Sequence, residues 1–323
     1  MNLDLLISNI TNPAFLFFVL GVLAVKLRSD LEIPANSSKF IALYLLFSIG
    51  FKGGQELSHE AFSFEILWSM LFGMAISLLI PVYTFFILKR RMSIDNATAI
   101  AAAYGSVSAV TFVTAVAYLD LQKLPLHGHM VAIMALMESP AIIAGLILFS
   151  VFNKEKRANT TPKMEVIRHS FTNGSVLLIL GSLVIGLLAN AKQAEGIKPF
   201  TNDIFKGFLA IFLLDMGITS GRKLRSFVSN GWFPLLFALF IPLFNGCAVA
   251  ILSALVTQDV ANQFMFAVLA ASASYIAVPA AMKIAVPAAD PGLYLPMALA
   301  VTFPINITIG MPLYLYITQL MAG

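Results

Sequence analysis

Charged residues are scarce in this chain. Of its 323 residues, 11% are Asp, Glu, Lys or Arg, whereas 59% are hydrophobic and the mean hydropathy is +0.89. A soluble globular domain usually contains about 25% charged residues, so this chain cannot cover a water-exposed surface with charge. Lipid must therefore be the solvent for much of its surface, and the composition predicts an integral membrane protein.

Cysteine and the common catalytic motifs are also rare or missing. Cys247 is the single cysteine, which excludes an intrachain disulfide framework and a cysteine metal site. The sequence has no GxxxxGK[ST] phosphate loop, so it carries no ATP-driven motor, and it has no GxSxG or HExxH motif. No extended basic and aromatic surface argues for nucleic acid. We therefore expect no enzyme, no catalytic residues, no cofactor and no nucleic-acid partner.

Long apolar segments fill most of the chain. A spanning helix needs roughly 20 mainly apolar residues, and about ten candidates follow one another. They lie near residues 13–27, 38–51, 63–88, 93–118, 129–152, 174–190, 203–219, 230–256, 260–282 and 293–321. The first has no Lys or Arg before Lys26, so we expect no secretory signal peptide. The sequence thus predicts an all-α integral membrane fold of about ten transmembrane helices.

Basic residues are distributed unevenly between the loops that join these spans. If the N-terminus lies outside and ten spans follow, 15 of the 20 Lys and Arg residues fall on the cytoplasmic side. Cytoplasmic loops of membrane proteins carry such an excess of positive charge. We therefore expect both termini outside. The basic stretch 154–168 is then a topology signal and linker, with a partner or lipid site as the alternative.

The two halves of the chain share an internal repeat. Residues 44–57 (YLLFSIGFKGGQEL) align without gaps with residues 211–224 (IFLLDMGITSGRKL). The offset of 167 residues is close to half the chain. The identical pairs in this alignment include Gly50 with Gly217, Gly54 with Gly221 and Leu57 with Leu224.

A second match pairs two serine-containing segments at a neighbouring offset, Ser106 with Ser272 and Ser108 with Ser274. If each half has five spans, an odd number, the second half must enter the membrane from the opposite side. Inverted repeats of this kind build many secondary transporters, with the substrate near the midplane where the halves meet. We therefore expect two inverted five-helix repeats and a cytoplasmic linker. Their bounds are 1–152 for the first repeat, 153–172 for the linker and 173–323 for the second repeat.

The matched serines lie inside the fourth and ninth spans. Irregular backbone in a membrane is tolerated only within protein or beside a water-filled cavity. Glycine allows unusual dihedral angles and Pro279 removes a backbone donor, so we expect both helices to be broken here. Half-helix N-termini would then suit an anion. The predicted substrate-binding residues are Gly105, Ser106, Val107, Ser108, Ser272, Ala273, Ser274 and Tyr275.

The same small residues could instead form a tight helix–helix packing face. Their occurrence at matching places in both halves favours a site. Freed carbonyls and hydroxyls would suit Na⁺, a hard cation that prefers oxygen ligands. The predicted ion-binding residues are Ser108, Thr111, Glu138, Ser274 and Asn306.

Other polar residues leave alternatives open. Glu138 lies inside the fifth span, where a carboxylate is a functional hypothesis by default, as a cation ligand, a proton carrier or a helix constraint. Asp215 lies near the predicted end of the seventh span, so a cap or interface role and ion binding both stay open. His127 and His129 form an HGH motif in a predicted external loop. Without a third ligand in view, we expect no metal site beyond a possible Na⁺.

Several segments resemble a known family. YGSVSAVT pairs with AASASYIAVPAAMKIAVPAADPGLYL, and IGFKGG and FMFAVL precede them. Together they resemble the sodium-dependent bicarbonate transporter family, known best from cyanobacteria, from about residue 12 to 318. The resemblance implies ten spans in two inverted repeats, gate and core domains and crossing broken helices. It also implies a homotrimer in the plasma (inner) membrane that takes up bicarbonate with Na⁺.

Carried over by position, the serines of the fourth and ninth spans would line the anion and Na⁺ sites. Glu138 occupies a place where the cyanobacterial members have an aspartate, but Tyr275 stands where they have another acidic residue. The linker is also shorter than theirs, so a PII-like regulatory partner is not carried over with the rest.

The sequence thus predicts a secondary active transporter of a small anion, by preference Na⁺-coupled bicarbonate uptake by alternating access. One alternative is a carrier of another small organic anion, coupled to Na⁺ or to protons through Glu138. A third reading, of a different class, is a membrane receptor or structural subunit that binds without transporting.

Overall fold

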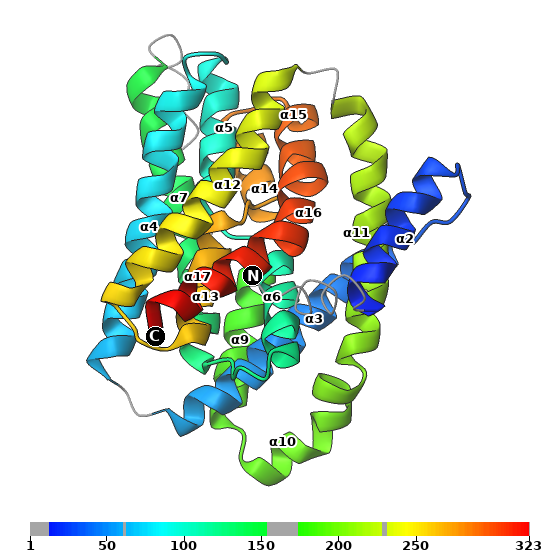
Figure 1. The fold of residues 1–323 in the computed structure, drawn as a ribbon, viewed down its shortest axis with the longest axis vertical. Helices are drawn as coiled ribbons and strands as arrows, with labels where there is room; N and C mark the ends of the chain where they lie inside the picture. Colours follow the sequence, from blue (N-terminus) through cyan, green and yellow to red (C-terminus); the bar gives the residue numbers. More distant parts are fainter. Residues whose placement is uncertain (1–12, 61–62, 154–173, 228–230, 323) are drawn as a thin grey trace.

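The structure is a computed structural model of the chain, and it describes residues 13–60, 63–153, 174–227 and 231–322 (Figure 1). Within these ranges the chain is all-helical and contains no β-strand. This confirms the predicted all-α class. The predicted linker 153–172 falls almost wholly outside the described residues.

Within the described residues, six helices belong to the first half of the chain. They are α2 (Pro13–Lys26), α3 (Ala35–His59), α4 (Phe64–Leu88), α5 (Ile94–Gly105), α6 (Ala109–Leu121) and α7 (Gly128–Phe152). The second half has α9 (Gly174–Leu188), α10 (Ala191–Lys198), α11 (Phe205–Phe227), α12 (Trp232–Leu252), α13 (Val260–Ala271), α14 (Ala277–Ala285), α15 (Pro291–Pro296), α16 (Phe303–Ile305) and α17 (Met311–Ala322). Short side chains cap many of these helices, as when Ser63 accepts a hydrogen bond from the Ile66 N–H at the start of α4.

Six helical stretches of the described residues are long and apolar enough to cross a membrane. They are Phe64–Leu88, Ile94–Leu121, Gly128–Phe152, Ala191–Leu224, Trp232–Leu255 and Pro291–Met321. Three shorter apolar helices lie at Leu16–Lys26, Val176–Leu188 and Val260–Ala271. Helices therefore occur at the predicted segments, and their length and apolarity fit an integral membrane protein.

Two predicted spans were too short. The segment predicted at 203–219 continues as α11 to Phe227, and the segment predicted at 38–51 is the 25-residue helix α3. Both helices end in polar residues that hide their length from a hydropathy count. Asp215 therefore lies at the middle of the helix α11, while its hydrogen-bond partner Ser38 lies in the first turn of α3. Its predicted place near a span end stays a prediction.

The helices α2, α3, α9 and α11 pack in two pairs beside the rest of the bundle. The pair α2 and α11 lies along one edge of the molecule in Figure 1, and α3 packs mainly on α9. The repeated glycines make both contacts close. A Cβ atom at Gly50 would lie 2.6 Å from the Ile179 carbonyl oxygen, and one at Gly221 would lie 3.1 Å from Val25 Cβ. Each pair therefore joins a helix of one half of the chain to a helix of the other.

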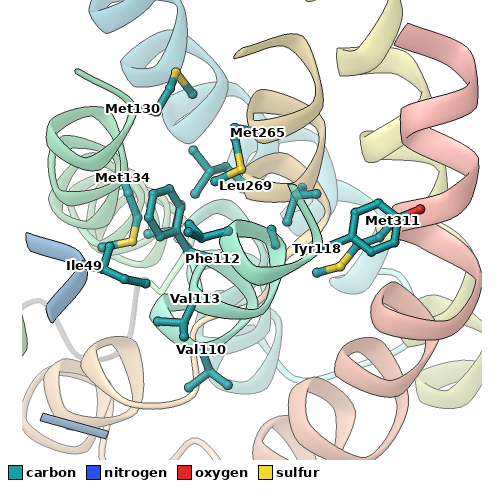
Figure 2. Packing of buried hydrophobic residues seen from close by; sticks show 14 of the residues in the cluster. Ile49, Val110, Phe112, Val113, Tyr118, Met130, Met134, Met265, Leu269 and Met311 are labelled. Atoms are coloured by element: carbon teal, nitrogen blue, oxygen red, sulfur yellow. The ribbon is translucent and has the colours of Figure 1, made fainter. Parts of the chain in front are cut away.

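The helices α6 and α13, which adjoin the two serine segments, pack in the interior of the bundle. Figure 2 shows Phe112 of α6 packed among Met134 of α7 and Met265 and Leu269 of α13. Each of these four side chains is at most 2% exposed. The serine segments thus lie inside protein, which is where irregular backbone is tolerated in a membrane.

Candidate functional site

Both serine segments interrupt a helix. The first break, residues 106–108, separates α5 from α6, and the second break, residues 272–276, separates α13 from α14. Ser106 and Ser272 have nearly the same extended backbone, with φ and ψ of −86° and 176° at Ser106 and −81° and 166° at Ser272. The structure therefore confirms the broken helices predicted in the fourth and ninth apolar segments.

The two breaks touch, and we call their contact the crossing. The Ser274 N–H donates a hydrogen bond to the Ala103 carbonyl oxygen at 2.8 Å. The Ser108 N–H donates to Ser272 Oγ at 2.9 Å, and Ser272 Oγ donates to the Leu269 carbonyl oxygen at 2.8 Å. Residues more than 160 positions apart are therefore joined through backbone groups that a continuous helix would have used internally.

Two helix N-termini begin at the crossing. Ser108 caps α6 by accepting from the Thr111 N–H at 3.2 Å, and Ser274 Oγ accepts from the Val278 N–H at 3.3 Å at the start of α14. Pro279 is the third residue of α14, where a helix N–H has no helical partner. The proline therefore fits the first turn of the second half-helix, just after the break. N–H groups and the positive dipole ends of α6 and α14 suit a small anion at the crossing.

Gly105 is needed for packing. A Cβ atom at this position would overlap the ring of Pro81 in α4. Of the other predicted substrate residues, Ser106, Val107, Ser108, Ser272, Ala273 and Ser274 are all buried, and Tyr275 is partly exposed. The structure thus brings the eight predicted residues together at or beside the crossing.

Tyr275 faces α11. Its hydroxyl donates to Met216 Sδ at 3.8 Å, and its side chain also interacts with that of Ser108. The tyrosine therefore sits between the crossing and the helix pair formed by α2 and α11.

The predicted ion ligands flank the crossing on two sides. Asn306 Nδ2 donates to the Ala271 carbonyl oxygen at 2.7 Å, and its Oδ1 accepts from the Tyr314 hydroxyl at 3.0 Å. Ser106 Oγ donates to the Glu138 carbonyl oxygen at 3.4 Å. Thr111 is buried in the first turn of α6. The Asn306 side chain thus caps the C-terminal end of α13, while Glu138 lies beside the C-terminal end of α5.

The Glu138 carboxyl group has no polar partner among the described residues of this region. Within the described part of the chain it has no hydrogen-bond or ion-pair partner, although its residue is only partly exposed. A carboxylate held this way in a membrane-spanning helix is costly. It is therefore free to take up a cation or a proton.

Two polar contacts in the bundle were missed in the sequence. The hydroxyls of Tyr104 and Thr302 are 2.8 Å apart, and Thr302 donates to the Ala238 carbonyl oxygen. The Ser38 hydroxyl donates to the Asp215 carboxylate. Single polar residues in apolar segments were the available signal, but nothing in the sequence says which of them are partners.

A cavity of about 510 Å³ lies between α3 and α11 and reaches the second break. Tyr275 and Ile276 of the second break line it, together with Ser38 and Asp215. Lys39 and Arg222 also line it, towards the start of α3 and the end of α11. This end of the two helices is the predicted cytoplasmic side, so the cavity connects that side with the crossing.

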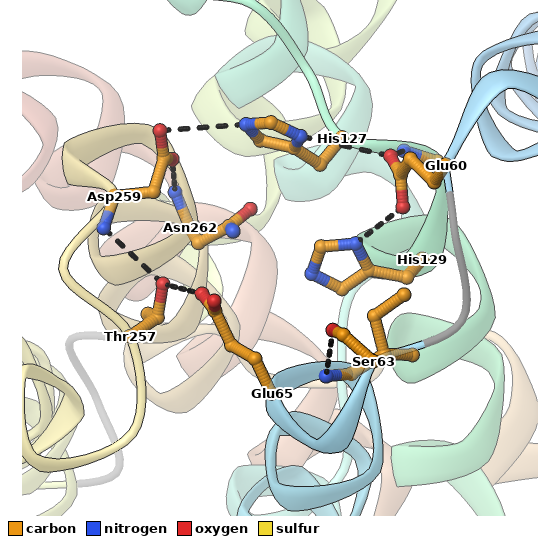
Figure 3. A network of polar contacts seen from close by, with 10 residues as sticks. Glu60, Ser63, Glu65, His127, His129, Thr257, Asp259 and Asn262 are labelled. Atoms are coloured by element: carbon orange, nitrogen blue, oxygen red, sulfur yellow. Dashed lines mark hydrogen bonds and ion pairs between the residues drawn. The ribbon is translucent and has the colours of Figure 1, made fainter.

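The HGH motif joins a polar cluster at the predicted external side (Figure 3). His129 Nδ1 lies 2.8 Å from Glu60 Oε2, and His127 Nε2 lies 3.4 Å from Asp259 Oδ2. Among the described residues no group of three or more His, Cys, Asp or Glu side chains could hold a metal ion. The cluster ties the end of α3 to the starts of α7 and α13.

Charge within this cluster is set by the contact of His127 with Asp259. The hydrogen bond to Asp259 raises the pKa of His127, against the opposing effect of burial. Burial alone would raise the pKa of Asp259, but the hydrogen bond from His127 and backbone N–H groups outweigh it and hold this pKa below its usual value. The pair therefore favours a charged imidazolium next to a carboxylate.

The chain matches one protein family over nearly its whole length. The match is to the family described as "Na+-dependent bicarbonate transporter superfamily", and it covers residues 13–319. A comparison with individually curated proteins gives no match. The family match spans both breaks, the paired helices and the cavity. The chain therefore belongs to the Na⁺-dependent bicarbonate transporter superfamily, a family of membrane transport proteins.

Proposed function

We propose that this protein is a secondary active transporter that takes up bicarbonate with Na⁺ by alternating access. The observation that carries the proposal is the crossing, where two broken helices meet inside the protein and direct two half-helix N-termini to one place. Discontinuous helices of this kind hold substrate and coupling ions near the midplane in many transporters. Bicarbonate is small and anionic, which fits backbone N–H groups and positive dipole ends.

We assign the anion to the N-termini of α6 and α14 and to the residues of the two breaks. The coupling Na⁺ would bind to oxygen atoms of Ser108, Thr111, Ser274 and Asn306, and the Glu138 carboxylate adds a negative charge on the side of α7. Protein surrounds the crossing, since the four serines of the two breaks are each at most 3% exposed.

We propose that the two halves are inverted repeats, at 1–152 and 173–323, giving ten spans with both termini outside the plasma (inner) membrane. Reciprocal packing supports this: α3 packs on α9 of the second half, and α11 packs on α2 of the first half. The aligned glycines Gly50 and Gly217 each meet the backbone of their partner helix. A homotrimer is part of the proposal, and it rests on the family resemblance. Regulation by a PII-like partner rests on the same resemblance. The short linker at 153–172 argues against it.

Transport would then move the broken-helix bundle against the paired helices α2, α3, α9 and α11. The cavity between α3 and α11 supports an inward-facing state, because it leads from the predicted cytoplasmic side to Tyr275 and Ile276. Closure there and opening at the predicted external side would complete the cycle.

A proton-coupled carrier of another small organic anion is the second candidate. The observation that favours it is the Glu138 carboxylate, which lacks a partner among the described residues and could release or take up a proton beside Ser106. A receptor or structural subunit needs no pair of matched breaks, so the crossing argues for transport over binding alone.

The deciding experiment is uptake of labelled bicarbonate into liposomes that contain the purified protein. We expect uptake with an inward Na⁺ gradient and none with choline in its place. Uptake driven by a proton gradient and indifferent to Na⁺ would favour the second candidate. No uptake under any gradient would contradict the bicarbonate assignment.

A further inference from the structure

Asp215 is a carboxylate in the middle of an apolar helix, away from the hydrogen bonds of the crossing. It lies halfway along α11, and its residue is only 7% exposed. Ser38 of α3 donates a hydrogen bond to its Oδ2 atom. A charged side chain at membrane depth is costly and is kept where it faces a bundle interior or a water-filled cavity. The position of Asp215 therefore calls for a function.

The carboxylate faces the cavity between α3 and α11. The residues of α11 that line the cavity recur at helical spacing, so they form one face: Phe212, Asp215, Met216, Ile218, Thr219 and Arg222. The opposite wall, on α3, contains the small residues Ala35, Ser38 and Ala42 together with the larger Lys39, Leu43 and Leu46. With about 510 Å³ the cavity has room for an ion and several waters, since a water fills roughly 30 Å³ of liquid.

The nearby basic residues do not neutralise Asp215 by direct contact. Arg222 pairs with Glu32 at 3.5 Å, and both side chains of that pair are at least half exposed. Lys39 is exposed, and no described side chain forms an ion pair with Asp215. The cavity wall at Asp215 thus carries a carboxylate with two hydroxyl groups nearby, from Ser38 and from Thr219 one turn along the same face.

This negative charge lies beside the path of the proposed substrate. Met216 adjoins Asp215 in sequence, and its Sδ accepts the hydroxyl of Tyr275 at the second break. An ionised Asp215 repels an anion that enters through the same cavity, since charges in a protein interior interact more strongly than in water. A cation bound to Asp215 removes that repulsion.

We propose that Asp215 and Ser38 form a Na⁺ site in the cavity, and that its occupancy admits the anion to the crossing. The ligands are the Asp215 carboxylate and the hydroxyl oxygens of Ser38 and Thr219, with water completing the shell. This inference rests on the proposed function for the identity of the coupling ion. It adds a site on the paired helices, separate from the ion ligands at the crossing.

The test is Na⁺ binding to the purified full-length protein, measured by radiolabelled Na⁺ with K⁺ as the competing ion. Specific binding is the labelled Na⁺ that an excess of unlabelled Na⁺ displaces. We expect Asp215→Asn to lower the affinity of this binding roughly tenfold or more, and Ser38→Ala to lower it less. Asp215→Glu, which keeps the charge, should restore part of the binding. Asp120→Asn is the matched control, because Asp120 pairs with Lys52 at the other end of the bundle. It should bind as the parent protein does.

Three outcomes would overturn the proposal. In the first, Asp215→Asn and Ser38→Ala bind Na⁺ as the parent does. In the second, K⁺ competes as well as Na⁺. In the third, Asp215→Asn lowers the melting temperature equally in Na⁺ and K⁺ and leaves Na⁺ affinity unchanged, as expected of a hydrogen bond that only clamps α3 to α11.

The failure of this proposal is distinguishable from failure of the proposed function. Na⁺ binding that depends on Asp215 in a protein that does not take up bicarbonate would uphold the site and reject bicarbonate as cargo. Bicarbonate uptake that keeps its Na⁺ dependence in Asp215→Asn would uphold the transporter and reject the site.

Discussion

The first break is three residues long and closed to solvent, whereas the second is five residues long and ends in the cavity. Val107, in the middle of the first break, is 4% exposed, but Ile276, the last residue of the second, is 43% exposed. The two breaks match in sequence and in backbone at Ser106 and Ser272, so the difference between them arises from their surroundings. In this conformation the second break therefore lines a cavity, whereas the side chain in the middle of the first break is buried.

We expect the largest effect from a substitution at Gly105, the last residue of α5 before the closed first break. Gly105→Ala would drive a methyl group into the Pro81 ring, so the variant should lose about 1–3 kcal/mol or more of stability or fail to fold. Melting temperature in detergent measures the loss. Gly181→Ala is the control, because nothing lies within 4 Å of its Cβ position. An unchanged melting temperature in Gly105→Ala would contradict the closed packing.

Ser272 joins the breaks more directly than Ser106 does. Ser272→Ala removes the acceptor of the Ser108 N–H, whereas Ser106→Ala removes only a bond of 3.4 Å to the Glu138 carbonyl oxygen. We expect bicarbonate uptake to fall roughly tenfold in Ser272→Ala and less in Ser106→Ala, with both proteins folded. Ser150→Ala, which affects only a hydrogen bond within α7, should transport normally. Normal uptake in both break variants would favour a pure packing role for these serines.

Cysteine labelling tests the different access to the two breaks. In a Cys247→Ala background, Ile276→Cys should react with a membrane-impermeant thiol reagent applied to the predicted cytoplasmic side. Val107→Cys should react much more slowly under the same conditions, because its side chain is buried. Equal labelling of the two positions would contradict the one-sided access.

We expect the smallest effect on stability at the predicted external end, where His127 of the first half of the chain pairs with Asp259 of the second half. His127 faces Glu60, Glu65 and Asp259, and its pKa lies above the usual 6.5 mainly because of its hydrogen bond to Asp259. The stability it adds is therefore complete below about pH 6.5 and is lost as pH rises through the raised pKa. The contribution of Asp259 has the opposite sense, since its pKa is lowered: it is present above about pH 3.8 and is lost in stronger acid.

We accordingly expect the melting temperature to fall slightly as pH rises from 6.5, because a partly exposed ion pair contributes little. His127→Gln should flatten this dependence. The control Lys52→Gln removes an ion pair elsewhere, between Lys52 and Asp120, and should leave the slope unchanged. A steeper fall in His127→Gln than in the parent would contradict the assignment.

Much of the fold could be predicted because it depends on local sequence. Runs of apolar residues gave the helices, and small polar residues with a glycine or a proline gave both breaks. The role predicted for Pro279 was only partly right. This proline lies in the first turn of α14, whereas α13 ends earlier, at Ala271. The length of a helix was underestimated where it continues into polar residues, as α3 and α11 do.

The partners at the site could not be predicted in the same way. Ser38 and Asp215 are 177 residues apart, and each is an ordinary polar residue in its own segment. The crossing itself was expected from a repeat, because matched segments in two halves meet by symmetry. Contacts without such a match, such as Tyr104 with Thr302, depend on how the helices pack and leave no trace in local sequence.

Substrate protection of the second break tests the central claim most directly. Labelling of Ile276→Cys is followed in Na⁺ with bicarbonate, in Na⁺ alone, in K⁺ with bicarbonate and in K⁺ alone. If bicarbonate and Na⁺ bind together at the crossing, the reaction slows markedly only when both are present. Labelling at the same rate in all four conditions would contradict bicarbonate binding at the crossing.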